Sequence, residues 1–524
     1  DVTTSNPRAN IGTNPETNIG MNPVANPNKA SVSSRSPHSL PLPYAPFYDP
    51  EFAPMILMVK AYRNLLKEHR AHSYFTFSVT RNGIPVETVR LEIMEHHERT
   101  RVYVERILKT YLWILGGNGL ILDGPKHLVA HIAEQYSPQG KRNFDVQFFS
   151  EVFGRAFEIT EGAPDSHPDT QPRQCEDRIS ARESLPQSLR SKTANVRIGI
   201  DLGGSTLKIT VLKDNQVLHR AGYAWTPKVQ SHPDYHYREI TSAVRKALEL
   251  TQINPNEVAS IGISSAGIVL DNAVIASSLF RAVPENLKEE VRVLFERVSR
   301  EFGNIPYQIV NDGEIAALAG KTAERSEAIL GLTLGTSLGC GYIDTDGKLT
   351  NQINELAFVP LDISDSAIID EWSGDRGAGV SYLSQDAAIK LAVNAGLFLP
   401  GETPSQQFQY LAQLLTTEPG TKTDEKPGTK LEPEQGRRQK IAERIFDDMG
   451  IYLGYAIAYY REFYAFRHLL LLGGVVAGRH GERIVQSAKQ VLSREFPDIS
   501  ENVEFVSVEH ASHIQDFVAA QMDQ

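Results

Sequence analysis

Apolar residues recur at helical or strand spacing along most of the chain, but two polar stretches interrupt this pattern. Residues 1–43 are rich in Asn, Pro, Ser and Thr, and residues 161–194 are rich in Pro, Ser, Arg and Glu. Segments of such composition bury too little apolar surface to offset the entropy lost on ordering. We therefore expect a disordered Asn/Pro-rich tail over 1–43, for which a regulatory role is the alternative, and a linker over 161–194.

Between these stretches, residues 44–160 carry both helical and strand periodicity, which predicts a small α+β unit. Strand-like runs flank Arg81-Asn82-Gly83, a sequence typical of a hairpin turn. The pattern predicts helices over residues 53–69, 95–115 and 126–136, and strands over residues 74–80, 86–93, 120–122 and 144–149.

After the linker, strands and helices alternate from residue 195 to residue 396, which is typical of α/β domains. Residues 400–437 contain the near-repeat EPGTKTDEKPGTKLEPEQG, which predicts a long, flexible and exposed loop inside a domain. A long helix over 437–467 follows. The next stretch, Leu469–Ala477, is the most apolar of the chain and predicts a buried strand.

Charge and composition narrow the class of protein. The 524 residues carry a net charge of -11, which argues against a general nucleic-acid binder, and we expect no nucleic-acid partner. Two cysteines, Cys175 and Cys340, are too few for a disulfide framework or a zinc ribbon, and they fit a reducing compartment. No apolar run reaches the roughly 18 to 20 residues of a membrane span. We therefore expect a cytoplasmic protein without a membrane partner.

The strongest chemical signal is the segment 196–212, VRIGIDLGGSTLKITVL. A strand ends at Asp201, and the turn Gly203-Gly204-Ser205-Thr206 leads directly into a second strand. Two glycines let the backbone approach a ligand closely, and consecutive N–H groups with two hydroxyls suit a phosphate. Asp201 could hold Mg²⁺ through water, since that ion prefers carboxylate oxygens and keeps its water shell. The alternative interpretation is a plain hairpin with a Gly-Gly turn.

A second segment, 329–344, repeats this design. A strand leads into Gly335-Thr336-Ser337, and the strand that follows contains Gly339 and Gly341. One such hairpin is weak evidence, but two of them, about 130 residues apart, could close on a triphosphate from both sides.

Two further strand ends carry candidate residues. The strand that ends at Asn311-Asp312 runs straight into an Ala-rich helix, so Asp312 is either a helix cap or a general base that faces a cleft. Gly473-Gly474 follows a buried strand and would let an adenine or a ribose lie against the turn; close packing of strand and helix is the alternative.

In this order the motifs resemble those of the ROK family (repressors, uncharacterised reading frames and sugar kinases), within the superfamily of sugar kinases, Hsp70 and actin. Residues 201–206 resemble its D-x-G-G-[ST]-x phosphate element, and Asn311-Asp312 resembles its N-D pair. Residues 334–341 resemble its second phosphate element, and Gly473-Gly474 resembles its adenosine element. The resemblance covers about residues 195–520.

The resemblance implies an α/β, two-lobed, actin-like and ribonuclease H-like ATPase fold, with lobes at 195–313 and 314–524 and the option that the C-terminal helix returns to the first lobe. It implies phosphoryl transfer from Mg-ATP to a hydroxyl of a sugar or sugar-like substrate, with Asp312 taking the hydroxyl proton. ATP and Mg²⁺ are thus the expected cofactors. Asn311 and Glu355 are implied as substrate contacts, and a homodimer is compatible with the resemblance.

The chain departs from the family pattern where that family carries a zinc motif. The family's E-x-G-H reads here as Glu355 followed by Phe358 in the place of the histidine. In the cysteine-rich part, Ser373 and Ala378 replace cysteines, and Val380 replaces a second glutamate. We expect no zinc, because no thiolate or imidazole remains to bind it.

The altered pocket leaves the substrate and the activity open. Arg281 and Arg376 could meet an anionic group, which would favour a sugar phosphate or sugar acid over a free sugar. We predict a carbohydrate kinase; the alternative is a nucleotide- or sugar-binding sensor or transcriptional regulator with little catalysis on the same fold. A DNA-binding repressor is disfavoured by the acidic charge and by the lack of a basic recognition helix in residues 44–160.

Overall fold

A computed structural model describes residues 44–69, 72–163, 196–204, 206–214, 216–270, 272–321, 325–416 and 432–506. The predicted tail, the predicted linker from residue 164 on, Ser205, Cys175 and the C-terminal segment from residue 507 lie outside the described residues. Within the described part, none of the helices combines the length and the apolar character that crossing a bilayer requires.

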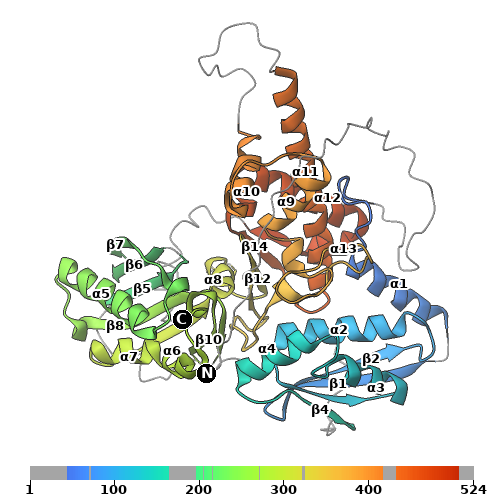
Figure 1. The fold of residues 1–524 in the computed structure, drawn as a ribbon, viewed down its shortest axis with the longest axis horizontal. Coiled ribbons are helices and arrows are strands. Elements are labelled where there is room, and N and C mark those ends of the chain that lie inside the picture. Colours follow the sequence, from blue (N-terminus) through green and yellow to red (C-terminus); the bar gives the residue numbers. More distant parts are fainter. Residues whose placement is uncertain are drawn as a thin grey trace, which may run out of the picture. The chain divides into compact units, whose positions relative to one another are not determined.

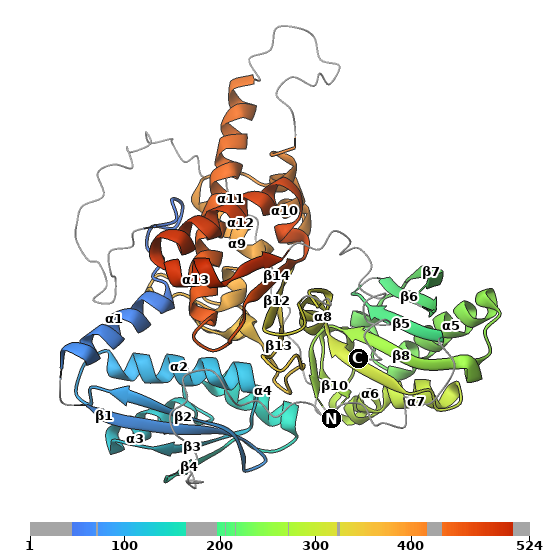
Figure 2. The same ribbon diagram turned by 180° about the vertical axis from the view of Figure 1, so that it is seen from behind.

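The first of three main sheets belongs to residues 44–163. Its strands are β1 (Ser73–Arg81), β2 (Ile84–Ile93), β3 (Gly119–Asp123) and β4 (Glu158–Glu161), in the order β2-β1-β3-β4. The predicted hairpin is confirmed: β1 and β2 pair in antiparallel fashion around Asn82 and Gly83, both of which have positive φ. The helices are α1 (Met55–Glu68), α2 (Thr100–Leu115), α3 (Lys126–Gln135) and α4 (Asn143–Phe153), and α2 runs along the sheet (Figures 1 and 2).

The predicted strand over 144–149 is wrong, because these residues form part of helix α4. The apolar run Phe-Asp-Val-Gln-Phe-Phe suits either structure in a short window. In the helix, Val146, Phe149 and Val152 fall three residues apart and are buried on one face, where Phe149 packs against Trp113 with ring centroids 4.7 Å apart. Tertiary packing thus decides an ambiguous local pattern.

The second sheet has five strands: β5 (Val196–Leu202), β6 (Thr206–Lys213), β7 (Gln216–Ala224), β8 (Val258–Ser265) and β11 (Tyr307–Asn311). Their order is β11-β8-β5-β6-β7. The first three strands form an antiparallel meander, and β8 and β11 add in parallel on the other side of β5. Helices α5 (Pro233–Thr251), α6 (Lys288–Arg292) and α7 (Leu294–Glu301) accompany it, together with the small β9–β10 pair (Ile268–Leu270 and Ala273–Ala276).

The third sheet repeats this plan. Strands β12 (Ile329–Leu334) and β13 (Leu338–Ile343) form an antiparallel hairpin, and β14 (His468–Leu472) and β15 (Glu504–Val506) add in parallel beside β12. The order β13-β12-β14-β15 therefore matches β6-β5-β8-β11 of the second sheet. A duplicated sheet of this kind is the predicted α/β, two-lobed, actin-like class, which is confirmed.

Six α-helices belong to the described part of the segment that forms the third sheet. They are α8 (Asp312–Ala319), α9 (Gln385–Asn394), α10 (Pro404–Gln413), α11 (Glu432–Tyr460), α12 (Gly478–Glu495) and α13 (Pro497–Asn502). The two longest, α11 and α12, lie side by side in both views (Figures 1 and 2). The predicted loop over 400–437 contains α10 and the start of α11, and its residues 417–431 lie outside the described part.

Two large apolar cores organise these elements. One core contains residues of the five-stranded sheet and of α5 and α7, from Val196 to Ile309. The other joins buried residues from α1, α2, α4 and the first sheet with residues of the third sheet and of α11 and α12. Residues 44–160 therefore share a continuous core with the segment 330–503.

Candidate active site

The first Gly-rich turn is closed by its own backbone. The Gly203 N–H donates to the Thr206 carbonyl over 3.0 Å, and a Cβ at Gly203 would meet that same oxygen at 2.7 Å. The Trp225 indole N–H donates to the Gly203 carbonyl over 2.7 Å, which adds a side-chain hydrogen bond to the turn. Ser205 lies outside the described residues.

Two lysines that sequence reasoning missed lie beside this turn. The Lys228 Nζ would lie 3.1 Å from a Cβ at Gly204, and the Lys208 Nζ lies 3.0 Å from Asp201 Oδ2. Lys208 could have been found, since it shares the hairpin with Asp201 and faces it in register. Lys228 follows a different strand, so only the fold brings its charge to Gly204. A turn of backbone N–H groups with an adjacent ammonium group suits an anion.

Asn311 and Asp312 join strand β11 to helix α8. Asn311 is the N-cap: its Oδ1 accepts from the Gly313 N–H over 2.7 Å, and Glu314 completes a capping box. The Asn311 amide also donates to the Gly267 carbonyl. Asn311, predicted as a substrate contact, thus has a capping role, and Asp312 is the first residue of the helix rather than its cap.

The carboxyl group of Asp312 has a raised pKa. Withdrawal from water raises the pKa of its carboxyl to about 6, the Gly313 N–H at 3.0 Å opposes this rise, and the Asp201 carboxylate adds to it. A base works best when its pKa lies near the working pH. Since the ordinary value is 3.8, the site moves this carboxyl toward a useful range.

Glycines bring the second hairpin onto Asp312. A Cβ at Gly339 would lie 3.3 Å from Asp312 Oδ1. On the neighbouring positions the backbones of α8 and β13 touch: a Cβ at Gly341 would lie 2.3 Å from the Gly313 carbonyl, and one at Gly313 would lie 2.3 Å from the Cys340 N. These glycines serve close helix-to-strand packing, which holds Asp312 beside the hairpin.

The tip of the second hairpin is open. The Gly335 N–H donates to the Ser337 carbonyl over 3.0 Å, and Thr336 and Ser337 are exposed. A Cβ at Gly335 would meet no atom of the described residues within 4 Å. The two predicted hydroxyl donors are therefore available to a ligand.

Gly473 and Gly474 have different surroundings. Gly473 has φ of +100° and lies against the end of β12, where a Cβ would meet the Leu334 carbonyl at 2.2 Å. Its presence is explained by packing and backbone conformation. Among the described residues, no atom lies within 4 Å of an ideal Cβ at Gly474, so of the two glycines this one has room for a ligand.

The Glu355 carboxyl group interacts electrostatically with Asp312. Its pKa is raised to about 8, first by withdrawal from water and then by the Asp312 carboxylate. No hydrogen bond to its carboxyl group is found among the described residues. Asp312 and Glu355 therefore form a pair of nearby carboxyl groups, of which Glu355 holds its proton more tightly.

The two predicted anion-binding arginines are not brought to this pair by any contact in the described part of the chain. Arg281 is exposed, and its Nε donates to the Lys228 carbonyl over 3.3 Å. Arg376 donates to the carbonyls of Asp365 and Ala367 over 2.7 and 3.0 Å. Arg281 thus lies next to the first turn, whereas Arg376 braces its own loop.

The positions of the family's zinc ligands have other occupants. Phe358 is buried and packs on Trp113 with ring centroids 4.4 Å apart, and Phe144 and Trp372 join it at 5.6 and 5.3 Å. The Ser373 hydroxyl donates to Asp370 Oδ2 over 2.6 Å. Within the described residues, one group of three His, Cys, Asp or Glu side chains has metal-like spacing, His232, Asp234 and Glu290, and Arg297 pairs with both of its carboxylates.

Part of the chain is similar to a known protein family. The fold defines the class as an α/β protein with a duplicated, actin-like arrangement of sheets. Residues 197–351 match the family model described as the ROK family, so the predicted resemblance is confirmed for this segment. It contains Asp201, both Gly-rich hairpins and Asp312, whereas Glu355 and Gly473 lie beyond it.

Solved structures described as ROK proteins are similar to this chain over 62 to 63% of its length. A ROK hexokinase from Thermus thermophilus is 17% identical, is covered over 97% of its length and has a TM-score of 0.45. A ROK glucokinase from Streptomyces griseus, in complex with glucose and AMPPNP, is 18% identical, 98% covered, with a TM-score of 0.43. A ROK transcriptional regulator, a homolog of the E. coli MLC protein, is 16% identical, 78% covered, with a TM-score of 0.46. The similar structures thus include kinases and a transcriptional regulator.

One curated protein matches a part of the chain. The choline dehydrogenase of Bacillus subtilis (strain 168) is 27% identical over 162 residues, which is 28% of this chain and 39% of that protein. The chain thus spans about two fifths of that relative. The activity in its name is not transferred to this chain.

Proposed function

We propose that this protein transfers a phosphoryl group from ATP to a hydroxyl of a sugar or sugar-like substrate. The observation that carries the proposal is Asp312: a carboxyl group at the start of a helix, with its pKa raised to about 6, beside Gly339 of an open Gly-rich hairpin. A phosphoryl-transfer enzyme needs a base next to the phosphate site, and this geometry supports that pairing.

Asp312 takes the proton of the acceptor hydroxyl in this proposal. The hydroxyl oxygen forms its bond to the γ-phosphorus as the bond from that phosphorus to the β–γ bridging oxygen breaks, and ADP leaves. Glu355, which keeps its proton near neutral pH, donates a hydrogen bond to a substrate oxygen and adds no second negative charge. Positioning and charge stabilisation supply most of the rate in such reactions.

The chain offers suitable groups for Mg-ATP. Lys228 and the turn at Gly204 would bind phosphate oxygens, Gly335, Thr336 and Ser337 would bind them from the second hairpin, and Gly474 leaves room for the nucleoside. Asp201 would hold Mg²⁺ through water after releasing Lys208, whose side chain is 41% exposed and free to move. When bound, Mg²⁺ neutralises charge on the phosphates.

A nucleotide- or sugar-binding regulator is the second candidate function. The observation that favours it is the altered pocket, in which Val380 replaces a glutamate and Arg376 is held by the carbonyls of its own loop. Such a protein would bind its ligands without turnover. A homodimer, a cytoplasmic location and a preference for an anionic sugar are further parts of the kinase proposal.

Acceptor-dependent ADP release tests the proposal. Purified protein with Mg-ATP is expected to release ADP faster when one member of a panel of sugars, amino sugars, polyols and sugar phosphates is added. Stimulation by a sugar phosphate alone would point to Arg281 as an anion contact. ATP binding without stimulation by any acceptor would contradict the kinase proposal and favour the regulator.

Replacing Gly204 by valine is expected to weaken ATP binding by at least tenfold, the factor that corresponds to about 1.4 kcal/mol. The fold should tolerate the change, because Gly204 is exposed, its φ is outside the left-handed range, and within the described part of the chain only the Lys228 side chain lies within 4 Å of the new Cβ. The valine would displace that ammonium group and fill the turn. Calorimetric titration with ATP measures the effect.

Gly436→Val serves as the matched control, since Gly436 lies in helix α11 and no atom of the described residues comes within 4 Å of an ideal Cβ there. Its ATP affinity should equal that of the wild type. An undiminished affinity in Gly204→Val would show that this turn is not the phosphate site.

A further inference from the structure

Glu355 is held by the end of a helix that lies far away in the sequence. The last carbonyls of an α-helix have no partner within the helix. At the C-terminal end of α2, the Trp113 carbonyl accepts from the Glu355 N–H and the Ile114 carbonyl accepts from the Asn354 N–H, each over 3.0 Å. The backbone that carries Glu355 therefore completes helix α2.

The residue before Glu355 has a conformation that depends on this support. Asn354 has φ of +49°, in the left-handed region that non-glycine residues rarely adopt. Its side-chain oxygen accepts from the Tyr464 hydroxyl over 2.9 Å. Next to it, Ile353 packs against Gly116, where a Cβ would approach Ile353 Cγ2 to 2.7 Å. Without these contacts, the backbone at Glu355 would no longer be fixed, and its side chain could change direction.

Arg81 connects the same helix end to the same segment. From the end of strand β1, its guanidinium group donates to the Gly116 carbonyl over 2.9 Å, to the Leu115 carbonyl, and to the Asn351 carbonyl over 2.7 Å. A cation at a helix C-terminus also interacts favourably with the helix dipole. One side chain thus connects residues 44–160 to the segment 351–355, which leads to Glu355.

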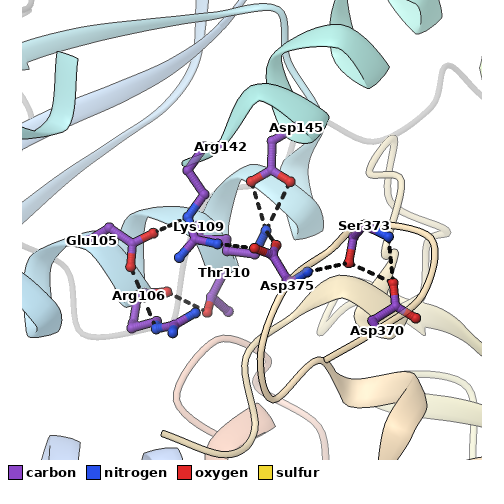
Figure 3. Close-up of polar contacts among 9 residues, drawn as sticks. All are labelled: Glu105, Arg106, Lys109, Thr110, Arg142, Asp145, Asp370, Ser373 and Asp375. Atoms are coloured by element: carbon purple, nitrogen blue, oxygen red, sulfur yellow. Dashed lines mark hydrogen bonds and ion pairs between the residues drawn. The ribbon is translucent and has the colours of Figure 1, made fainter. Parts of the chain in front are cut away.

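A second anchor holds the loop that follows. Lys109 of α2 lies 2.7 Å from Asp145 Oδ2 and 2.5 Å from Asp375 Oδ2, and Arg142 pairs with both Asp375 and Glu105 (Figure 3). All these charged side chains are buried. Residues 105–145 thus reach Asp375, a residue of the loop where the family carries its cysteines.

The anchored loop returns to the backbone beyond Glu355. Two residues after Asp375, the Gly377 carbonyl accepts from the Leu361 N–H over 2.8 Å, and the Gly379 N–H donates to the Val359 carbonyl over 2.9 Å. Glu355 therefore lies between two attachments to residues 44–160: the end of α2 on one side and the Asp375 ion cluster on the other.

We infer that residues 44–160 are a positioning device for Glu355, with Arg81 as the positioning residue that couples helix α2 to the segment 351–355. The inference rests on the proposed function, since it assigns Glu355 to the acceptor. It gives the N-terminal unit a role within the active site of its own chain: fixing the carboxyl group that meets the sugar hydroxyls.

Arg81→Ala tests this role by a split between the two substrates. Loss of hydrogen bonds from a charged group is expected to raise KM for the acceptor about tenfold. KM for ATP should stay at the wild-type value, because the hydrogen bonds described for Arg81 go to the end of helix α2 and to Asn351, which do not belong to the phosphate turns. Arg81→Lys keeps the positive charge but lacks the planar guanidinium group with its several N–H donors. Its KM for the acceptor should therefore lie between those of the wild type and Arg81→Ala.

Arg90→Ala is the matched control, an exposed arginine of the adjacent strand β2 whose guanidinium group lies over the Tyr74 ring, 3.7 Å from its centroid. Its kinetics should be unchanged. Acceptor KM equal in Arg81→Ala and Arg90→Ala, or KM raised equally for both substrates, would overturn the inference. A wild-type protein with no acceptor-stimulated ADP release would instead overturn the proposed function, on which the inference rests.

Discussion

Asp312→Asn is expected to lower kcat by about 10²- to 10⁴-fold, the usual contribution of a general base, and to leave the affinity for ATP near the wild-type value. Asparagine has the shape of aspartate but cannot accept the hydroxyl proton. It also retains a side-chain oxygen for the Gly313 N–H, 3.0 Å from Asp312 Oδ1, so the start of helix α8 should persist. Single-turnover transfer and calorimetric titration with ATP measure the two quantities. Unchanged turnover would exclude Asp312 as the base.

The pH profile provides a second readout of the same residue. A base is active in its deprotonated form, and kcat/KM reports groups of the free enzyme. Because the pKa of Asp312 is raised to about 6, kcat/KM should increase with pH up to about 6, and it should fall again above about 8, where Glu355 loses the proton that it donates to the substrate. An aspartate at its ordinary value of 3.8 would place this limb two pH units lower. The limb should be absent from the residual activity of Asp312→Asn.

Local patterns were sufficient to predict the elements that carry the candidate site. Each Gly-rich turn lies between two strands whose apolar runs are short and bounded, so β5–β6 and β12–β13 could be located from sequence. The junction of β11 and α8 at Asp312 was predicted in the same way. These elements depend on neighbours in the sequence, which is the information that periodicity carries.

Contacts between distant residues could not be predicted by periodicity. Helix α2 reads as an ordinary amphipathic helix, yet its charged residues Glu105 and Lys109 are buried and find their partners in α4 and in a loop. Arg142 and Asp375 are 233 positions apart. For the same reason the role of Lys228 beside Gly204, and the attachment of Glu355 to helix α2, became evident only from the fold.

The departure from the family's zinc motif shows the limit most clearly. Sequence reasoning noted that Phe358, Ser373 and Ala378 cannot bind zinc, but it offered no replacement for the support that a metal would give. In the structure, Phe358 packs in an aromatic group with Trp113, and Asp375 enters a buried ion cluster. The loop that contains Asp375 is thus anchored by residues from 105–145, which lie outside the zinc motif.

Asp375→Asn is expected to lower the free energy of unfolding by about 3–5 kcal/mol, because breaking a buried ion pair leaves uncompensated charge. Without this carboxylate, Lys109 and Arg142 would keep Asp145 and Glu105 as their buried carboxylate partners within the described residues. Urea unfolding followed by tryptophan fluorescence measures the change. A Trp225→Phe background restricts the signal to Trp113 and Trp372, which flank Phe358, since Trp225 belongs to the other apolar core.

An exposed ion pair provides the comparison. Glu434 lies 3.5 Å from Arg438 and its side chain is 57% exposed, so Glu434→Gln should cost less than about 1 kcal/mol. Equal urea midpoints for the two variants would contradict a stabilising role for the cluster.

The wild type should also be sensitive to acid: burial opposes ionisation of Glu105, but Arg142 and Arg106 lower its pKa to about 2. Its contribution is therefore present above the ordinary glutamate pKa of 4.5 and is lost as the pH falls toward 2, where the carboxylate that holds Arg142 becomes neutral.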